Sequence, residues 1–187
     1  VTLIMNTVQP IRNKEQIEAM KAALSPRDRL LFVVGINSGL RISDILNLKV
    51  GDIRNQDVIT VREQKTRKAK RFRLNGAIKR EFNRYLVSLS HQPTDDEYLF
   101  QSRKGTNQPI TRHTAYRLLN AAAKKVGITD KIGCHSLRKT FGYHAYRAGV
   151  DLSLLQSIFN HSSQAITLRY IGIQQDDIDE VYANIEL

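Results

Sequence analysis

Cysteine and tryptophan are scarce in this chain of 187 residues, which holds one cysteine and no tryptophan. The single cysteine, Cys134, excludes an internal disulfide and favours a reducing compartment, so we expect it to be a small buried packing residue. No apolar run approaches the roughly 20 residues that a membrane span needs, and no signal-peptide pattern is present. These absences predict a cytoplasmic protein without a membrane partner.

Acidic residues are outnumbered by basic ones, 18 Asp and Glu against 29 Lys and Arg, which gives a formal net charge of +11. An excess of this size favours a polyanionic partner, although charge alone leaves DNA, RNA and an anionic membrane open. The acidic residues gather at 95–97 and in an amphipathic tail over 174–187. We expect the tail to dock on protein, either the chain's own body or a neighbouring subunit.

Helical periodicity and capping residues predict a mainly α-helical α+β fold. We expect helices over residues 13–24, 26–37, 41–48, 76–89, 111–126, 135–148, 151–159 and 164–171. Residues 57–74 differ, because a β-branched segment and an alternating segment flank a basic turn, which predicts an antiparallel hairpin with a charged tip. We expect one domain over 1–187, with an N-terminal arm at 1–12.

Five separated features carry side chains suited to phosphate chemistry. In chain order they are Gly39-Leu40-Arg41, Lys65 in the basic turn, His135-Ser136-Leu137-Arg138, His161, and Tyr170 nine positions after that histidine. Guanidinium groups can meet two phosphate oxygens at once, which suits Arg41 and Arg138. His135 and Arg138 share one helix face at a spacing of three. A phenol such as Tyr170, with an ordinary pKa of about 10, needs help with deprotonation before it attacks.

In this order and spacing the features resemble the tyrosine recombinase (phage integrase) family, whose catalytic domain the chain matches from about Asn13 to Ile173. The resemblance implies a catalytic set of Arg41, Lys65, His135, Arg138, His161 and Tyr170. It implies a site-specific recombinase or integrase that cleaves and rejoins double-stranded DNA through a 3′-phosphotyrosyl intermediate. It further implies no cofactor, no ATP, and a tetramer on DNA, for which we expect contacts through the C-terminal tail.

The resemblance also assigns roles. His135 would assist proton transfer at the nucleophile, and His161 would donate a hydrogen bond to the phosphate. Lys65 would protonate the leaving 5′-oxygen, although neighbouring lysines leave open which one is the acid. Asp44, which follows Arg41 by three residues, would hold that guanidinium or else be a solvated helix charge. The expected DNA-binding residues are Arg67, Lys68, Lys70, Arg112 and Arg117, with His113 beside them.

One departure from the family pattern is Phe159-Asn160, where the family usually has Leu-Gly before the second histidine. Asparagine tolerates the left-handed backbone conformation that glycine supplies, so we expect the turn to persist. Another departure is that we expect no N-terminal core-binding domain, and therefore weak, salt-sensitive affinity for DNA.

Two other readings remain open, a type IB topoisomerase and a DNA-binding module without activity. The topoisomerases usually carry lysine where this chain has His135, which favours the recombinase. No metal site is expected, because the acidic residues lie away from the motifs and neither the single cysteine nor the histidines form a usual zinc pair.

Overall fold

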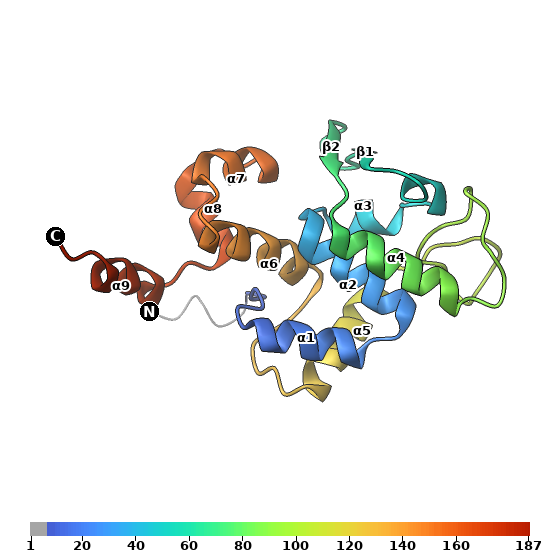
Figure 1. Cartoon of the computed structure of the whole chain (residues 1–187), viewed down its shortest axis with the longest axis horizontal. Helices are drawn as coiled ribbons and strands as arrows, with labels where there is room; N and C mark the ends of the chain where they lie inside the picture. Colours follow the sequence, from blue (N-terminus) through green and yellow to red (C-terminus); the bar gives the residue numbers. More distant parts are fainter. Residues whose placement is uncertain (1–6) are drawn as a thin grey trace.

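The structure is a computed structural model that describes residues 7–187 (Figure 1). Its elements are α1 (Lys14–Ala23), α2 (Pro26–Ser38), α3 (Ile42–Leu46), the 3-10 turn η1 (Val50–Asp52), β1 (Val58–Arg62), β2 (Ala69–Arg73), α4 (Gly76–Ser88), α5 (Arg112–Lys125), α6 (Cys134–Arg147), α7 (Leu152–Phe159), α8 (Gln164–Ile171) and α9 (Gln175–Asn184). Every expected helix and the hairpin are present, which confirms the mainly α-helical α+β fold.

Helix α2 is the centre of the main core. Its residues 30–34 are at most 2% exposed, and it packs against both α4 and α6. Ser25 caps its start by accepting a hydrogen bond from the Asp28 backbone N–H, and Gly39 ends it at a φ of 64°. A Cβ on Gly39 would lie 2.5 Å from the Phe141 ring, so glycine is required there. The tight turn delivers Arg41 to the start of α3, beside α6.

The hairpin pairs β1 with β2 in an antiparallel register from Val58 opposite Arg73 to Arg62 opposite Ala69. Ile59, which is 2% exposed, joins the hairpin to the main core. The turn at 63–68 projects away from that anchor, as Figure 1 shows above α3. This arrangement places the expected basic tip at the edge of the molecule.

Helix α6 lies between the main body and the helical pair α7–α8 (Figure 1). A second, small core of Leu155, Phe159 and Ile171 packs against its far side. Close approach requires Gly142, because a Cβ there would lie 2.5 Å from Ile171 and 2.7 Å from Phe159. Asn160 ends α7 at φ 56° and ψ 44°, which confirms the left-handed turn expected before His161.

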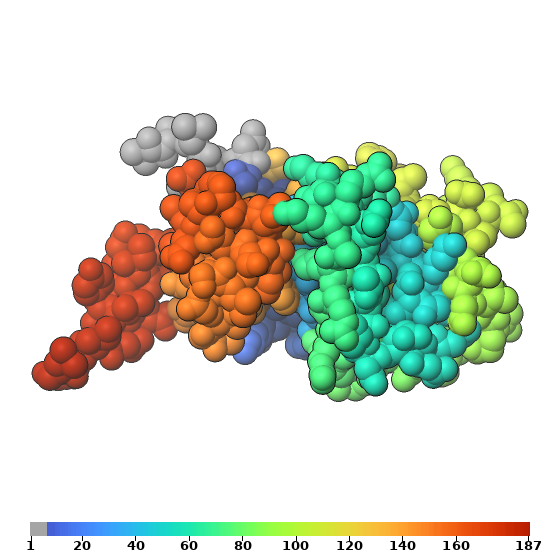
Figure 2. Space-filling model, turned by 90° about the horizontal axis from the view of Figure 1, so that it is seen from above, coloured from blue at the N-terminus to red at the C-terminus, as the bar shows by residue number. Residues whose placement is uncertain are grey.

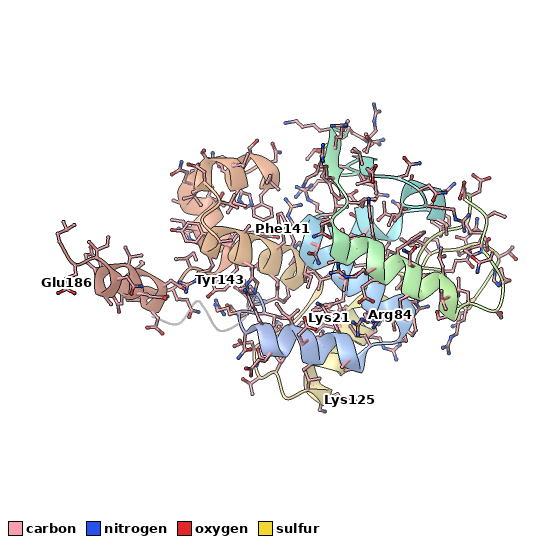
Figure 3. All side chains as sticks on the ribbon, in the orientation of Figure 1. Lys21, Arg84, Lys125, Phe141, Tyr143 and Glu186 are labelled. Carbon is pink, nitrogen blue, oxygen red and sulfur yellow. The ribbon has the colours of Figure 1, made fainter. Side chains whose placement is uncertain are left out.

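Helix α9 extends from the body, and Figures 1 and 2 show it standing apart from the rest of the chain. Its ties to α6 are polar: Arg147 is 2.6 Å from Glu180, and the Tyr143 hydroxyl, on the residue labelled in Figure 3, donates to Asp177 over 3.4 Å. Apolar side chains on α9 stay exposed, including Val181 at 55% and Tyr182 at 78%. The tail therefore contacts α6 through polar side chains, and its apolar side chains remain exposed.

The described part of the N-terminal arm, residues 7–12, runs along α6. Backbone and side-chain bonds hold it there, including Ile11 N–H to Thr140 Oγ1 at 2.9 Å and Arg12 Nη2 to the Gly172 carbonyl at 2.8 Å. Residues 1–6 of the expected arm lie outside the described residues. Cys134 is buried, as expected. Over residues 7–187, none of the helices combines the length and apolarity needed to cross a membrane.

Candidate active site

The six expected catalytic side chains come from four neighbouring parts of the fold. Arg41 precedes α3, Lys65 lies in the hairpin turn, His135 and Arg138 are on α6, and His161 and Tyr170 belong to the α7–α8 region. The hairpin and α7 meet directly, because Lys70 Nζ donates to the Ile158 carbonyl and Lys68 Nζ to Asn160 Oδ1, each over 3.3 Å. Figure 2 shows the hairpin and the α7–α8 region facing each other on one surface.

Arg138 lies at the centre of this group and is only 4% exposed. Its Nη2 donates to the Phe159 carbonyl over 3.1 Å, and its guanidinium carbon is 4.8 Å from the centre of the Phe159 ring. Its Nη1 is buried without a hydrogen-bond partner among the described residues. Buried donors without partners are rare, so this guanidinium is suited to receive an acceptor from outside the chain. Burial also lowers the pKa of Arg138.

Tyr170 lies against the same guanidinium. Its ring centre is 5.0 Å from that of His161 and 5.4 Å from that of Phe159, and Lys139 Nζ is 5.1 Å from it. Burial raises the pKa of the phenol, whereas the nearby charges of Arg138 and Arg41 oppose that rise. An incoming phosphate at Arg138 would therefore find the phenol beside it.

Arg41 is paired with a carboxylate that the sequence did not indicate. Its Nη1 is 2.9 Å from Glu63 Oε2, and the Glu63 side chain is only 7% exposed. Asp44, expected as the possible partner, instead accepts a hydrogen bond from the Gln64 backbone N–H through Oδ1 over 3.0 Å. Its Oδ2 is buried without a partner in the described chain. Asp44 thus anchors the hairpin turn next to Lys65, and Glu63 holds Arg41.

Positive charge is concentrated around Arg41, Arg138 and Lys70 and shifts the pKa values of the titratable groups there. Burial, reinforced by Arg138 and Arg41 against the opposing charges of Glu63 and Asp44, lowers the pKa of Lys70 to about 8. A cation buried among cations lacks a full counter-charge, and an anion would supply it. Within residues 7–187, no three His, Cys, Asp or Glu side chains come close enough to hold a metal ion.

The two expected catalytic histidines, His135 and His161, both have a lowered pKa. For His135 the largest cause is burial, followed by the charge of Arg112, whose Nη2 is 3.4 Å from His135 Nε2. For His161 it is burial, followed by Arg138 and Arg41. His161 Nδ1 lies 3.0 Å from the hydroxyl of Thr167. Near neutral pH both imidazoles are therefore uncharged, and a neutral imidazole can accept a proton.

The remaining expected residues lie in the hairpin and on α5. Lys65 and Arg67 are exposed in the hairpin turn, and within residues 7–187 the Lys65 ammonium has no hydrogen-bond or ion-pair partner. Arg112, His113 and Arg117 are exposed on α5, the first two beside His135 around a hollow of about 600 Å³. Lys68 and Lys70 are the exceptions, because both reach the α7 end.

Three nearby residues escaped sequence reasoning: Glu63, Lys139 and Thr167. Nothing in the sequence separates Glu63 from other hairpin charges, since its partner lies 22 positions earlier. Lys139 follows Arg138 directly, yet only the fold shows its ammonium over the Tyr170 ring. Thr167 carried a usable signal, because it is one helical turn before Tyr170 and faces the core.

Comparison with known proteins gives a consistent result. The profile described as the phage integrase family matches residues 11–176. The chain is 45% identical over 181 residues to the probable integrase/recombinase YoeC of Bacillus subtilis, covering 95% of this chain and 97% of that protein. It is 30% identical over 163 residues to the tyrosine recombinase XerA of Pyrococcus furiosus, covering 86% of this chain and 55% of that protein. It thus spans about half the length of that XerA protein.

Two solved structures share the fold. A crystal structure of XerA recombinase superposes with a TM-score of 0.78 at 24% identity, covering 97% of this chain and 68% of that one. A post-cleavage complex of the XerH site-specific recombinase bound to palindromic difH substrate superposes with a TM-score of 0.75 at 22% identity. That alignment covers 97% of this chain and 54% of the XerH chain.

Proposed function

The chain belongs to the phage integrase family, and from that membership we propose that residues 11–176 form the catalytic domain of a site-specific tyrosine recombinase acting on double-stranded DNA. The observation that carries the proposal is the Tyr170 phenol beside the buried guanidinium of Arg138, whose Nη1 has no partner among the described residues. A DNA phosphate is the group that would satisfy both, as acceptor for the arginine and as electrophile for the phenol.

We propose that Arg138 and Arg41 hold the non-bridging oxygens of the scissile phosphate. Negative charge grows on those oxygens during attack, and preorganised donors stabilise it. The ion pair with Glu63 holds the Arg41 guanidinium in place. His161 would add a further hydrogen bond to the same oxygens.

Tyr170 would then attack the phosphorus. The new bond joins the phenol oxygen to phosphorus, and the bond from phosphorus to the 5′-oxygen breaks. The phenol proton would pass to His135, which is uncharged near neutral pH, and the leaving 5′-oxygen would take a proton from Lys65. One phosphoester replaces another, so the reverse attack by a 5′-hydroxyl rejoins a strand without ATP. We propose that no metal or other cofactor takes part.

The exposed hairpin turn and α5 would supply the DNA contacts through Arg67, Arg112 and Arg117. Lys68 and Lys70 would add contacts nearer the end of α7. Such contacts with phosphates make affinity fall steeply with salt. The apolar side of α9 would pack on a neighbouring subunit in a tetramer on DNA, since its own body leaves that side uncovered. Chemical cross-linking on DNA tests this, and Val181→Asp should reduce the tetramer while leaving single-site binding intact.

A covalent-trapping assay tests the main proposal. The chain is incubated at low salt in EDTA with a pool of nicked suicide duplexes of randomised target sequence. We expect an SDS-resistant protein–DNA adduct that Tyr170→Phe abolishes and Tyr98→Phe, which removes the same hydroxyl elsewhere, preserves. Relaxation of any supercoiled plasmid without site preference would support a topoisomerase instead. Binding without any adduct would support an inactive module.

A further inference from the structure

The hydroxyl of Thr167 lies at a position that can decide which nitrogen of His161 carries the imidazole proton. Thr167 is on α8 one turn before Tyr170, and it is fully buried. Its Oγ1 is 3.0 Å from His161 Nδ1 and 3.3 Å from the Ser163 carbonyl. The hydroxyl has one proton to donate, so it can serve only one of these two neighbours at a time.

The two arrangements have opposite consequences. If Thr167 donates to Ser163, Nδ1 must carry the proton, and the other ring nitrogen, Nε2, can only accept. If Thr167 donates to Nδ1, the proton resides on Nε2, which can then donate. The oxygens of an ionised phosphodiester accept hydrogen bonds and carry no proton to donate, so only the second arrangement lets a neutral His161 bind one.

Geometry favours the second arrangement. The Ser163 carbonyl already accepts the Thr167 backbone N–H, so it does not need the hydroxyl proton. The contact with Nδ1 is also the shorter of the two. Burial and the nearby arginine charges lower the pKa of His161, which removes the doubly protonated form as an easy way to obtain an Nε2 proton.

We propose that Thr167 is a positioning residue that donates its hydroxyl proton to His161 Nδ1 and so fixes the Nε2–H form that hydrogen-bonds the scissile phosphate. The proposal rests on the proposed function only for the identity of the phosphate. The proton position itself is a property of the chain without DNA.

Nitrogen-15 NMR of the full chain at pH 8 provides the direct test. We expect His161 to show an unprotonated, hydrogen-bonded Nδ1 and a protonated Nε2 in the wild type and in Thr167→Ser, which keeps the hydroxyl. Thr167→Val has nearly the same volume without the hydroxyl, and it should lose the Nδ1 hydrogen-bond signature. A protonated Nδ1 in the wild type would overturn the proposal even if Tyr170 forms the expected adduct.

Titration with dimethyl phosphate, a phosphodiester that has no proton to donate and keeps one charge from pH 5 to pH 8, adds a pH signature that a packing defect would not give. At pH 8 Thr167→Val should weaken phosphate binding about 3- to 10-fold, the size of one net hydrogen bond. Below the imidazole pKa both nitrogens carry protons, so the difference should shrink towards zero. Thr140→Val, which removes another buried hydroxyl from α6, should show no such pH dependence. A Thr167→Val defect that is equal above and below the imidazole pKa, as measured by the same nitrogen-15 NMR, would also overturn the proposal.

Discussion

The two cores of this molecule differ greatly in size, and the active site lies between them. The main core around α2 includes buried side chains from all five helices α1 to α5, from η1 and from β1, whereas β2 adds only the partly buried Phe72. The core beneath α7 and α8 consists of Leu155, Phe159 and Ile171, with partly buried neighbours. Arg41 belongs to the large region, His161 and Tyr170 belong to the small one, and Arg138 connects them.

The expected catalytic residues are therefore divided between a large, deeply packed region and a small one. The Arg41 guanidinium is held on a deeply packed scaffold, as expected for a preorganised anion site. Tyr170, the proposed nucleophile, lies in a unit with a small hydrophobic core. Such units unfold locally at a lower free energy than the whole domain. We infer that Tyr170 can move relative to Arg41. The ring of Phe159 contacts Tyr170, and the bonds of Lys68 and Lys70 to the end of α7 hold this unit against the hairpin.

The largest expected effect comes from truncating one phenylalanine in each core. Phe32→Ala and Phe159→Ala should each cost about 3–5 kcal/mol, because both side chains are at most 1% exposed. Phe32→Ala should weaken the whole fold, whereas Phe159→Ala should open residues 152–171 alone. Hydrogen-exchange mass spectrometry distinguishes these outcomes. Equal loss of protection in α2 and α8 for both variants would show that the two cores unfold as one unit.

Arg138→Lys sharpens the comparison at the residue that spans both regions. Lysine keeps the charge but loses the planar fork that reaches the Phe159 carbonyl and a phosphate together. We expect the rate of adduct formation to fall about 10²- to 10³-fold, the usual cost of one transition-state donor. Arg29 forms an ion pair with Glu81 outside this site, so Arg29→Lys serves as the control. A rate near that of the control would remove Arg138 from the phosphate site.

Sequence reasoning succeeded where a local pattern determines the structure. Capping residues and periodicity predicted a helix from residue 26, where α2 begins, and Asn160 was expected to adopt the left-handed conformation that the structure shows. It failed where partners are distant or interchangeable. Asp44 was expected either to hold Arg41 or to be a solvated helix charge, but the chain folds Glu63 of the hairpin onto that arginine and uses Asp44 to hold the hairpin turn. Nor could it rank the hairpin lysines, because burial of Lys70 depends on how β2 meets α7.

Lys70→Met tests how much stability the protein loses by burying the Lys70 ammonium where β2 meets α7. The folded pKa of Lys70 is about 8, below its ordinary value of 10.5. The unfolded chain therefore binds more protons between these values, so wild-type stability should rise with pH across that interval by up to about 3 kcal/mol, less with solvent screening. Below pH 8 the penalty is fully present, and Lys70→Met should be the more stable protein.

Denaturant unfolding at pH 7 and pH 10 measures this difference, with Lys65→Met as the exposed control. The gap between Lys70→Met and wild type should close as pH rises, and the gap for Lys65→Met should not change. A pH-independent gap for Lys70→Met would mean that the ammonium is well solvated. The hairpin would then join α7 without electrostatic strain.

The smallest expected effect concerns Asp44, which links the large core to the hairpin turn. Asp44→Ala removes the acceptor for the Gln64 backbone N–H and should loosen the turn that carries Lys65. We expect adduct formation to slow about tenfold, equivalent to one hydrogen bond. If the loss acts through proton donation by Lys65, a 5′-bridging sulfur in the DNA should restore the rate, because a thiolate leaves without being protonated. Glu63→Gln, which disturbs Arg41, should not be restored by sulfur, since phosphate binding is still required. Failure of sulfur to rescue Asp44→Ala would place Asp44 with the phosphate-binding scaffold and not with the leaving-group acid. Equal rescue of both variants would mean that Glu63, which accepts a hydrogen bond from Thr66 in the same turn, also acts through the acid.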